Sequence, residues 1–225
     1  MPSAAERQKA GLLKKAARES RKRLGKNAQS RFGRFLDAYY ANVPPRDIGE
    51  SDPVTLFHLS HGHWKLSAVR AKGKPLIRVF NPEPRKDGWK SERTIIEIVN
   101  DDMPFLVDSV TAELNRQNLT VRLIIHPILK VRRDKAGKLL DIMKGGQKAD
   151  GSIAESFMHL QVSRLSGRRL KGVETGIRKV LDDVRAAVHE AISETAGLTT
   201  APPFSPPTNG KRFDGNGSPQ ADDGE

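Results

Sequence analysis

The sequence contains no cysteine, which excludes disulfide bonds, thiolate metal sites and cysteine nucleophiles. It has no apolar run near the roughly 20 residues that a membrane-spanning helix needs. Its N-terminus is charged and lacks the apolar core of a secretory signal. Together these absences predict a soluble, cytoplasmic protein with no membrane partner.

Nucleotide-binding motifs are missing too. Neither G-x-G-x-x-G nor G-x-x-x-x-G-K-[ST] occurs, and the glycine pair at 145–146 stands in a polar loop rather than at a strand–helix turn. We therefore expect no cofactor to be bound by this chain.

Apolar residues make up 36% of the 225 residues and charged residues 29%, which predicts a modest core and some disorder. The net charge of +12 is uneven: residues 1–34 carry +9, and residues 200–225 carry −2. The high isoelectric point is therefore mainly a property of the N-terminal arm. The basic run at 14–26 could touch RNA or acidic lipid, but it has no interleaved aromatic residues. A solvated helical arm is favoured over a nucleic-acid partner.

The N-terminal part is predicted to be helical over residues 1–40, with an apolar cluster near its end that packs on something: Phe32, Phe35, Leu36, Tyr39 and Tyr40. The helix is predicted to end in a turn-rich segment at 42–53. Asp52, before Pro53, is predicted to start another short helix. A strand bounded by prolines is predicted at 75–84.

The order of elements from 93 to 190 predicts an α+β fold. Strand 93–99, which is apolar on both faces, is followed by helix 104–117 and by a long strand at 119–133 that is broken at Pro127. A hairpin turn is predicted at 134–137 and a polar loop at 143–154. Strand 155–163 and a helix from about 168 to 194 complete the region. This is a β-α-β-β-α plait of the ACT or ferredoxin-like type, with helices on one side of the sheet. The last strand is missing, and strand 76–80 is a candidate to replace it.

These elements suggest four regions. They are a basic helical arm (1–50), a linker with a short helix and a strand (51–92), an ACT-like regulatory domain (93–195) and a disordered tail (196–225) rich in Pro, Gly, Ser, Asn and Asp.

The stretch NDDMPFLVDSV, residues 100–110, joins the central strand to its helix. Asp102 is predicted to be the N-cap and Pro104 to lie in the first turn. An acidic turn of Asn100, Asp101 and Asp102 could hold the ammonium group of an amino acid while the helix N-terminus takes its carboxylate. The alternative is that these residues only cap the helix and close the turn.

Three histidines, His58, His61 and His63, stand close together in FHLSHGHW. Imidazoles at this spacing could hold a metal, but no carboxylate in the run completes a site. A surface turn anchored by Trp64 is the preferred interpretation, and no metal is predicted.

Several long stretches resemble one known family. They are YYANVPPRDI, HWKLSAVRAKGKPLIRVFNPEP, GWKSERTIIEIVNDDMPFLVDSVTAELNRQNLTVRLIIHPILKVRRD and ESFMHLQVS. Over roughly residues 30–190 the sequence resembles the N-terminal ACT-type (ACT1) region of the large bacterial NAD-specific glutamate dehydrogenases. The resemblance implies a regulatory ACT fold and favours a ligand at Asn100, Asp101, Asp102 and Phe105.

Members of that family are several times longer, and their nucleotide-binding and catalytic parts lie far downstream. The chain therefore looks truncated before the catalytic part, and we expect no catalytic residue in it. The resemblance implies a regulatory segment, inactive alone, of an enzyme that oxidises L-glutamate with NAD. The alternative is a stand-alone amino-acid-sensing module that regulates a partner protein. Expected partners are a second copy, the remaining domains of the dehydrogenase, and an amino-acid effector.

Overall fold

The computed structural model describes residues 1–143 and 151–198. Its helices are α1 (Ala4–Arg23), α2 (Lys26–Tyr40), α3 (Pro45–Ile48), α4 (Pro53–Leu66), α5 (Pro84–Asp87), α6 (Leu106–Arg116) and α7 (Gly167–Leu198). Its strands are β1 (Leu76–Phe80), β2 (Arg93–Asp101), β3 (Val121–Ile125), β4 (Ile128–Arg133), β5 (Leu139–Ile142) and β6 (Ser152–Ser163). The chain divides into two units, residues 1–188, which contain the whole sheet, and residues 189–225.

The described strands form one antiparallel sheet built around β6. Strand β2 pairs along one side of β6, from Arg93 opposite Ser163 to Asp101 opposite Glu155. On the other side β3 pairs with the C-terminal half of β6 and β4 with its N-terminal half, and β5 lies beyond β4. The break at Pro127, predicted from sequence, therefore separates two strands that share one long neighbour.

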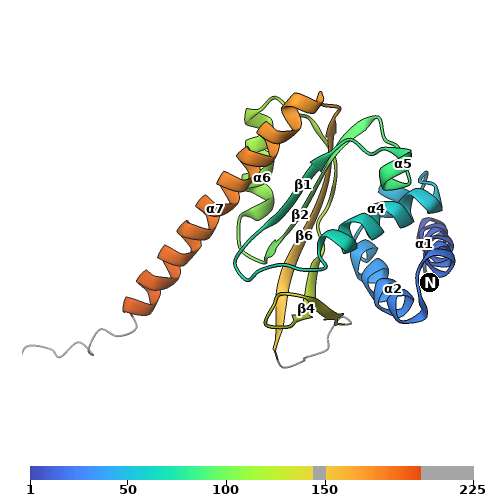
Figure 1. The fold of residues 1–225 in the computed structure, drawn as a ribbon, viewed down its shortest axis with the longest axis horizontal. Helices are drawn as coiled ribbons and strands as arrows, with labels where there is room; N and C mark the ends of the chain where they lie inside the picture. Colours follow the sequence, from blue (N-terminus) through green and yellow to red (C-terminus); the bar gives the residue numbers. More distant parts are fainter. Residues whose placement is uncertain (144–150, 199–225) are drawn as a thin grey trace, which may run out of the picture. The chain divides into compact units, whose positions relative to one another are not determined.

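Strand β1 occupies the position of the missing fourth strand of the plait. It pairs antiparallel with β2, from Leu76 opposite Val99 to Phe80 opposite Ile95. This confirms the predicted substitution and the α+β plait. A strand that precedes the plait in sequence thus covers the edge that a following strand would otherwise cover (Figure 1).

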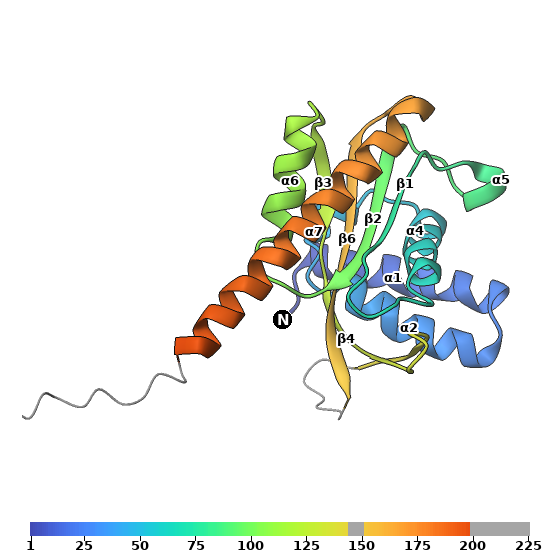
Figure 2. The same cartoon turned by 60° about the vertical axis from the view of Figure 1, so that its left-hand side comes forward.

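Helices cover both faces of the sheet. On one face α6 and α7 pack through Val110, Leu114, Val173, Ile177 and Leu181 on Ile96, Ile98, Met158, Leu160 and Val162. On the opposite face lie α1, α2 and α4, where Phe35 of α2 contacts Phe157 of β6 with ring centroids 5.5 Å apart. Figures 1 and 2 show the sheet between these two groups of helices. The prediction of helices on one side was therefore wrong for the sheet as a whole, because the N-terminal region supplies a second layer.

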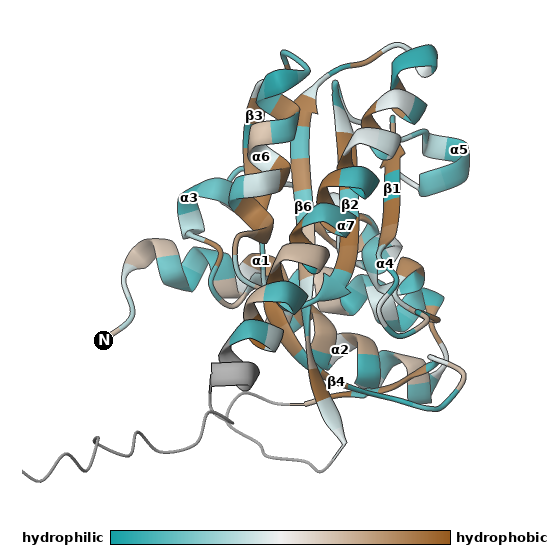
Figure 3. Ribbon diagram, turned by 90° about the vertical axis from the view of Figure 1, so that its left-hand side faces the viewer, coloured by the Kyte–Doolittle hydropathy of each residue, from teal (hydrophilic) through white to brown (hydrophobic). Residues whose placement is uncertain are grey.

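Double coverage explains why the central strands are apolar on both faces. Seven consecutive residues of β2, Thr94–Asn100, are buried, and Figure 3 shows the hydrophobic character of β2 and β6. An antiparallel strand with one solvated face would alternate apolar and polar residues. The apolar content of 93–99 thus reflects its central place between two layers.

The N-terminal region was predicted to form one helix over residues 1–40, but it forms a hairpin of two helices, α1 and α2. Helix α1 begins with a capping box formed by Ser3 and Glu6 and ends before Gly25, whose extended backbone lets α2 fold back. Glycine is unfavourable inside a helix, which makes it a natural break. The predicted apolar cluster at the end of α2 is fully buried, and Asp52 caps α4 by accepting from the Thr55 N–H, as predicted.

The start of α6 differs from the prediction. Its N-cap is Phe105, with φ of 65°, and Pro104 lies before the helix. Asp102 is not the cap; its N–H donates to the Ala154 carbonyl, which extends the ladder between β2 and β6 by one bond. At the other end Asn118 has φ of 57°, the left-handed conformation expected where a helix terminates.

Two other predictions concern loops. The predicted end of the polar loop at residue 154 was wrong. Strand β6 already begins at Ser152, which pairs with Arg132 of β4. Residues 144–150, and residues 199–225 of the predicted tail (196–225), lie outside the described residues.

Replacing Phe157 by alanine tests whether the N-terminal helices belong to the fold. Phe157 is completely buried between the sheet and α2. We expect Phe157→Ala to lower the free energy of unfolding by about 3–5 kcal/mol, because truncating a buried phenylalanine leaves a cavity. Chemical denaturation measures this.

Lys130→Ala on the exposed side of β4 is the control, with an expected change within about 0.5 kcal/mol. Similar values for both variants would show that the N-terminal layer does not pack on the sheet.

Candidate functional site

Asn100 and Asp101, two of the predicted ligand residues, end strand β2 and both bind Arg185 of α7. Arg185 Nη2 donates to Asn100 Oδ1, and Nη1 donates to Asp101 Oδ2, each at 2.7 Å. Asn100 is completely buried and Asp101 is partly exposed. A single guanidinium thus ties the end of the central strand to the long helix.

The second oxygen of Asp101 accepts from Arg70, which lies in the segment after α4. The Arg70 side chain is completely buried, and it also donates to Glu155 Oε1 through Nε at 2.9 Å and Nη2 at 2.8 Å. Burial acts to raise the pKa of Asp101, but hydrogen bonds from Arg70 and Arg185 outweigh it and hold the pKa below its ordinary value. Asp101 is therefore a carboxylate held between two arginines.

Glu155 of β6 is the most enclosed member of this group, with a completely buried side chain. Besides Arg70 it binds Arg133 of β4, whose Nε and Nη2 donate to its two oxygens at 2.7 and 2.8 Å. Arg133 Nη1 donates to the carbonyls of Ser67 and Gly137. A buried charge is tolerated only when its partners satisfy its hydrogen bonds, and here each oxygen of Glu155 has a donor.

We call this set the arginine–carboxylate network: Arg70, Asp101, Arg133, Glu155 and Arg185. It joins five parts of the chain: the segment after α4, β2, β4, β6 and α7. The glycine at 137 allows its tight packing, since a side chain there, at φ of 80°, would start 2.2 Å from the Arg70 carbonyl oxygen.

Two buried nitrogens beside the network have no hydrogen-bond partner among the described residues, Asn100 Nδ2 and Arg185 Nε. Both are donors, and leaving a buried donor unpaired costs about 1–3 kcal/mol. The end of β2 therefore has hydrogen-bonding capacity that an oxygen acceptor would satisfy.

Of the four predicted ligand residues, Asp101 belongs to the network and Asn100 binds its member Arg185, whereas Asp102 and Phe105 lie outside it. Asp102 is exposed and interacts electrostatically with His126, whose Nε2 is 2.7 Å from Ser156 Oγ. The Phe105 side chain is 71% exposed. Sequence reasoning found Asn100 and Asp101 but missed the three arginines and Glu155, which are distant in sequence and carry no local motif.

The three clustered histidines point to different neighbours. His63 is buried; its Nδ1 accepts from the Tyr39 hydroxyl at 3.0 Å, and its Nε2 donates to the Ile98 carbonyl at 3.2 Å. Burial lowers the pKa of His63 to about 3. His61 stacks on Phe57. Within residues 1–143 and 151–198, no three His, Asp or Glu side chains are placed to hold a metal ion.

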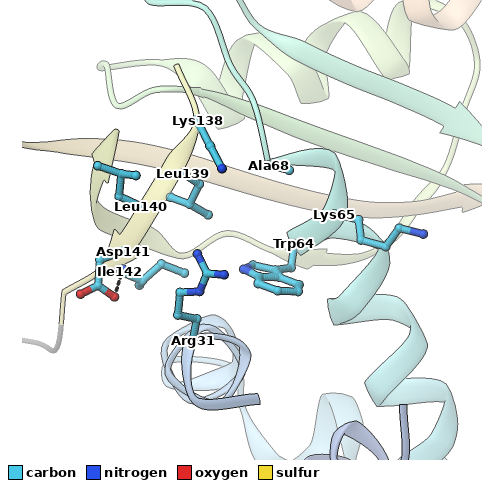
Figure 4. A pocket seen from close by; sticks show the side chains of 9 residues that line it. All are labelled: Arg31, Trp64, Lys65, Ala68, Lys138, Leu139, Leu140, Asp141 and Ile142. Atoms are coloured by element: carbon cyan, nitrogen blue, oxygen red, sulfur yellow. Dashed lines mark hydrogen bonds between the residues drawn. The ribbon is translucent and has the colours of Figure 1, made fainter. Parts of the chain in front are cut away.

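A cavity of about 310 Å³ opens between α2, the end of α4 and β5. Figure 4 shows the Arg31 guanidinium near the Trp64 indole and Ile142, with Leu139 and Leu140 on the strand side. None of the described polar atoms that line it is both buried and unpartnered. The cavity is mainly an apolar hollow.

Glu97, in the middle of β2, is a buried acid on the face covered by α4. Its exposure is 1%, and burial raises its pKa to about 8 even though Arg78 acts to lower it. Its cross-strand neighbours are Arg78 on β1 and His159 on β6, and burial lowers the pKa of His159 to about 3. The surroundings of Glu97 on this face therefore favour a neutral acid and a neutral imidazole.

Comparison with known proteins places the chain in a family. The family described as glutamate dehydrogenase, ACT1 domain, matches residues 35–177, more than half of the chain. The chain belongs to the glutamate dehydrogenase ACT1-domain family. The match covers the plait strands, α6, the network residues up to Glu155 and the first turns of α7.

Relatives of this ACT1-domain chain carry the name NAD-specific glutamate dehydrogenase. The protein from Halomonas elongata is 32% identical over 83% of the chain, that from Pseudomonas aeruginosa 31% over 73%, and that from Mycobacterium tuberculosis 28% over 61%. The chain spans 12%, 10% and 8% of their lengths, respectively. The resemblance inferred from sequence is confirmed. Among the described helices, none combines the length and the apolar character needed to cross a membrane.

Glu155→Gln tests the contribution of the network to stability. The change keeps the shape of the side chain but removes the negative charge that faces Arg70 and Arg133. We expect a loss of about 3–5 kcal/mol in unfolding free energy, because Arg133 loses its carboxylate partner and the buried Arg70 loses one of its two. Urea denaturation measures the loss.

Glu174→Gln on α7 is the matched control, since Glu174 pairs only with exposed Lys171 and Arg178 among the described residues. A surface pair contributes about 0–1 kcal/mol. A loss at Glu155 no larger than this would contradict a stabilising role.

Glu97→Gln tests the raised pKa of Glu97. An acid whose pKa rises on folding stabilises the fold at low pH and loses that contribution as pH rises from about 4.5 to 8. Glutamine does not ionise, so the variant should gain stability relative to the wild type as the pH increases over this range. The buried histidines act in the opposite sense but are present in both proteins.

The measurement is the unfolding free energy of the wild type and of Glu97→Gln at several pH values between about 4.5 and 8. The groups around Glu97 that also titrate or carry charge are Arg78, Asp87, His159, His58, His61, Lys65, Lys86 and Tyr39. A difference independent of pH would mean that Glu97 ionises normally in the folded protein.

Proposed function

We propose that this chain is the regulatory N-terminal region of an NAD-dependent glutamate dehydrogenase and has no dehydrogenase activity alone. The parent reaction would convert L-glutamate and NAD to 2-oxoglutarate, ammonia and NADH. The observation that carries the proposal is the ACT1-domain match over residues 35–177, in a chain that spans about a tenth of its relatives. NAD would then bind to the parent enzyme and not to this segment.

The arginine–carboxylate network supports a regulatory role. Arg185 holds α7 to the end of β2 through Asn100 and Asp101. An amino acid has the same two groups as this contact, a carboxylate to pair with an arginine and an ammonium to pair with an aspartate. Binding there would replace the Arg185 contact and change how α7 is held, and a ligand can shift a structure only through such differential contacts.

The four predicted ligand residues would act together in this proposal. Asn100, Asp101 and Asp102 would surround the ammonium group, and the exposed Phe105 would contact the side chain of the effector. The unpartnered nitrogens of Asn100 and Arg185 would meet its carboxylate. We propose the remaining domains of the dehydrogenase, or a second copy of this chain, as the partner that receives the change.

A stand-alone sensing module that regulates a separate protein is the second candidate. The two candidates share the proposed ligand site. They differ in the size of the protein that the cell contains: a large dehydrogenase in the first case and a small separate protein in the second. An antibody against residues 93–190 distinguishes them in cell extracts. A large species would favour regulation within one chain, and a species near 24.9 kDa would favour the module.

The proposal predicts that the purified 225-residue chain forms no NADH from L-glutamate and NAD. The Pseudomonas aeruginosa NAD-specific glutamate dehydrogenase, assayed in parallel by absorbance, is the positive control. Glutamate-dependent turnover by the chain that survives repurification would disprove the claim that it is inactive alone.

A further inference from the structure

A second cavity, of about 410 Å³, lies between α4, α5 and the strands β1 and β2. Glu97 lies at its sheet side, Phe80 and Trp89 are buried apolar parts of its wall, and exposed Lys65 and Lys86 come from the two helices. The cavity is therefore lined by two acids, Glu97 and Asp87, and by two solvent-facing lysines, and Asp87 is already bound to Arg78. It is separate from the end of β2, where Asn100 and Asp101 bind Arg185.

The Glu97 carboxyl has unused hydrogen-bonding capacity. Its Oε2 is buried and has no hydrogen-bond partner among the described residues. The nearest cation is Arg78, whose Nη1 lies 3.8 Å from Oε2, too far for a hydrogen bond. Arg78 is already bound to Asp87 and lies over the Phe80 ring at 3.5 Å, so these contacts hold it in place.

Gly62 keeps the space beside Glu97 open. It lies inside α4, where glycine costs about 0.5–1 kcal/mol relative to alanine. A Cβ at this position would lie 3.6 Å from Glu97 Oε1 and 3.8 Å from Arg78 Nη1. A larger side chain would extend into the space in front of the carboxyl.

We propose that this cavity binds a small zwitterion of the α-amino acid class, with its ammonium group on Glu97 Oε2 and its carboxylate towards Lys65 and Lys86. An ammonium is a charged donor, and charge-assisted hydrogen bonds to a carboxylate are roughly twice as strong as neutral ones. Phe80 and Trp89 offer apolar contact for a side chain. The ligand's regulatory meaning rests on the proposed function; its binding does not.

The surrounding histidines suit this ligand. Burial lowers the pKa of His61 to about 4 and also lowers the pKa of His58. Both imidazoles are therefore neutral at neutral pH and do not repel an ammonium group. Because Glu97 is held protonated by burial, an ammonium that pairs with it should displace a proton, and affinity should rise as the pH increases towards about 8.

The test is thermal unfolding of the 225-residue chain with each proteinogenic L-amino acid in turn, at millimolar concentration. A ligand that binds the folded state raises the midpoint of unfolding. For the amino acid with the largest effect, its decarboxylated amine and its deaminated acid are compared, and calorimetry gives Kd at several pH values up to about 8.

We expect a rise in the midpoint with the amino acid and a smaller rise with either analogue. Glu97→Gln should weaken binding roughly ten- to hundredfold, the equivalent of a lost charged hydrogen bond. Gly62→Leu should fold normally but block the cavity. Glu92→Gln, an exposed acid outside the cavity, is the matched control and should bind like the wild type.

Failure to stabilise the wild type with any amino acid would overturn the inference, as would full binding by both cavity variants. If binding survives Glu97→Gln but is lost in Asp101→Asn, the ligand binds at the end of β2; the proposed function then stands and this inference fails. Dehydrogenase activity of the chain would overturn the proposed function without affecting binding at Glu97.

Discussion

The fold depends on a buried arginine between two carboxylates. Asp101 and Glu155 are direct cross-strand partners on β2 and β6, and like charges in that position repel. Arg70 resolves the conflict because its Nη2 donates to both carboxylates. The segment after α4 must therefore follow one path, since the guanidinium has to reach the space between the two strands. Removing Arg70 would leave the two cross-strand carboxylates without the cation that lies between them.

The same contact connects the two layers of helices. Arg70 follows α4 on one face of the sheet, and Arg185 belongs to α7 on the other; Asp101 accepts from both. The N-terminal helices are consequently held to the plait by charge as well as by the apolar contacts around Phe157. A change at the end of β2 would therefore alter contacts with both layers.

Sequence periodicity predicted the elements well where one local pattern determines them. The run 93–99, the strand 76–80 and the long helix predicted from about 168 were all found this way. Sequence periodicity failed where contacts between residues distant in sequence determine the local structure. The cap of α6 is Phe105 and not Asp102 because the Asp102 N–H pairs with β6. The arginine–carboxylate network could not be predicted from periodicity, because its members are spread between Arg70 and Arg185 and form no local sequence motif.

The two candidate sites on β2 differ in what binding would cost. At the end of the strand, Asn100 and Asp101 already bind Arg185, so a ligand gains only the difference between its own contacts and those it replaces. At Glu97 no hydrogen bond to Oε2 has to be broken, and the cost is instead the ionisation of a carboxyl that burial keeps protonated. Asp101 lies four positions after Glu97 on the same strand. A ligand that fixes Glu97 would therefore act on the element that also carries the contact with α7, which gives the two sites a direct physical route for coupling.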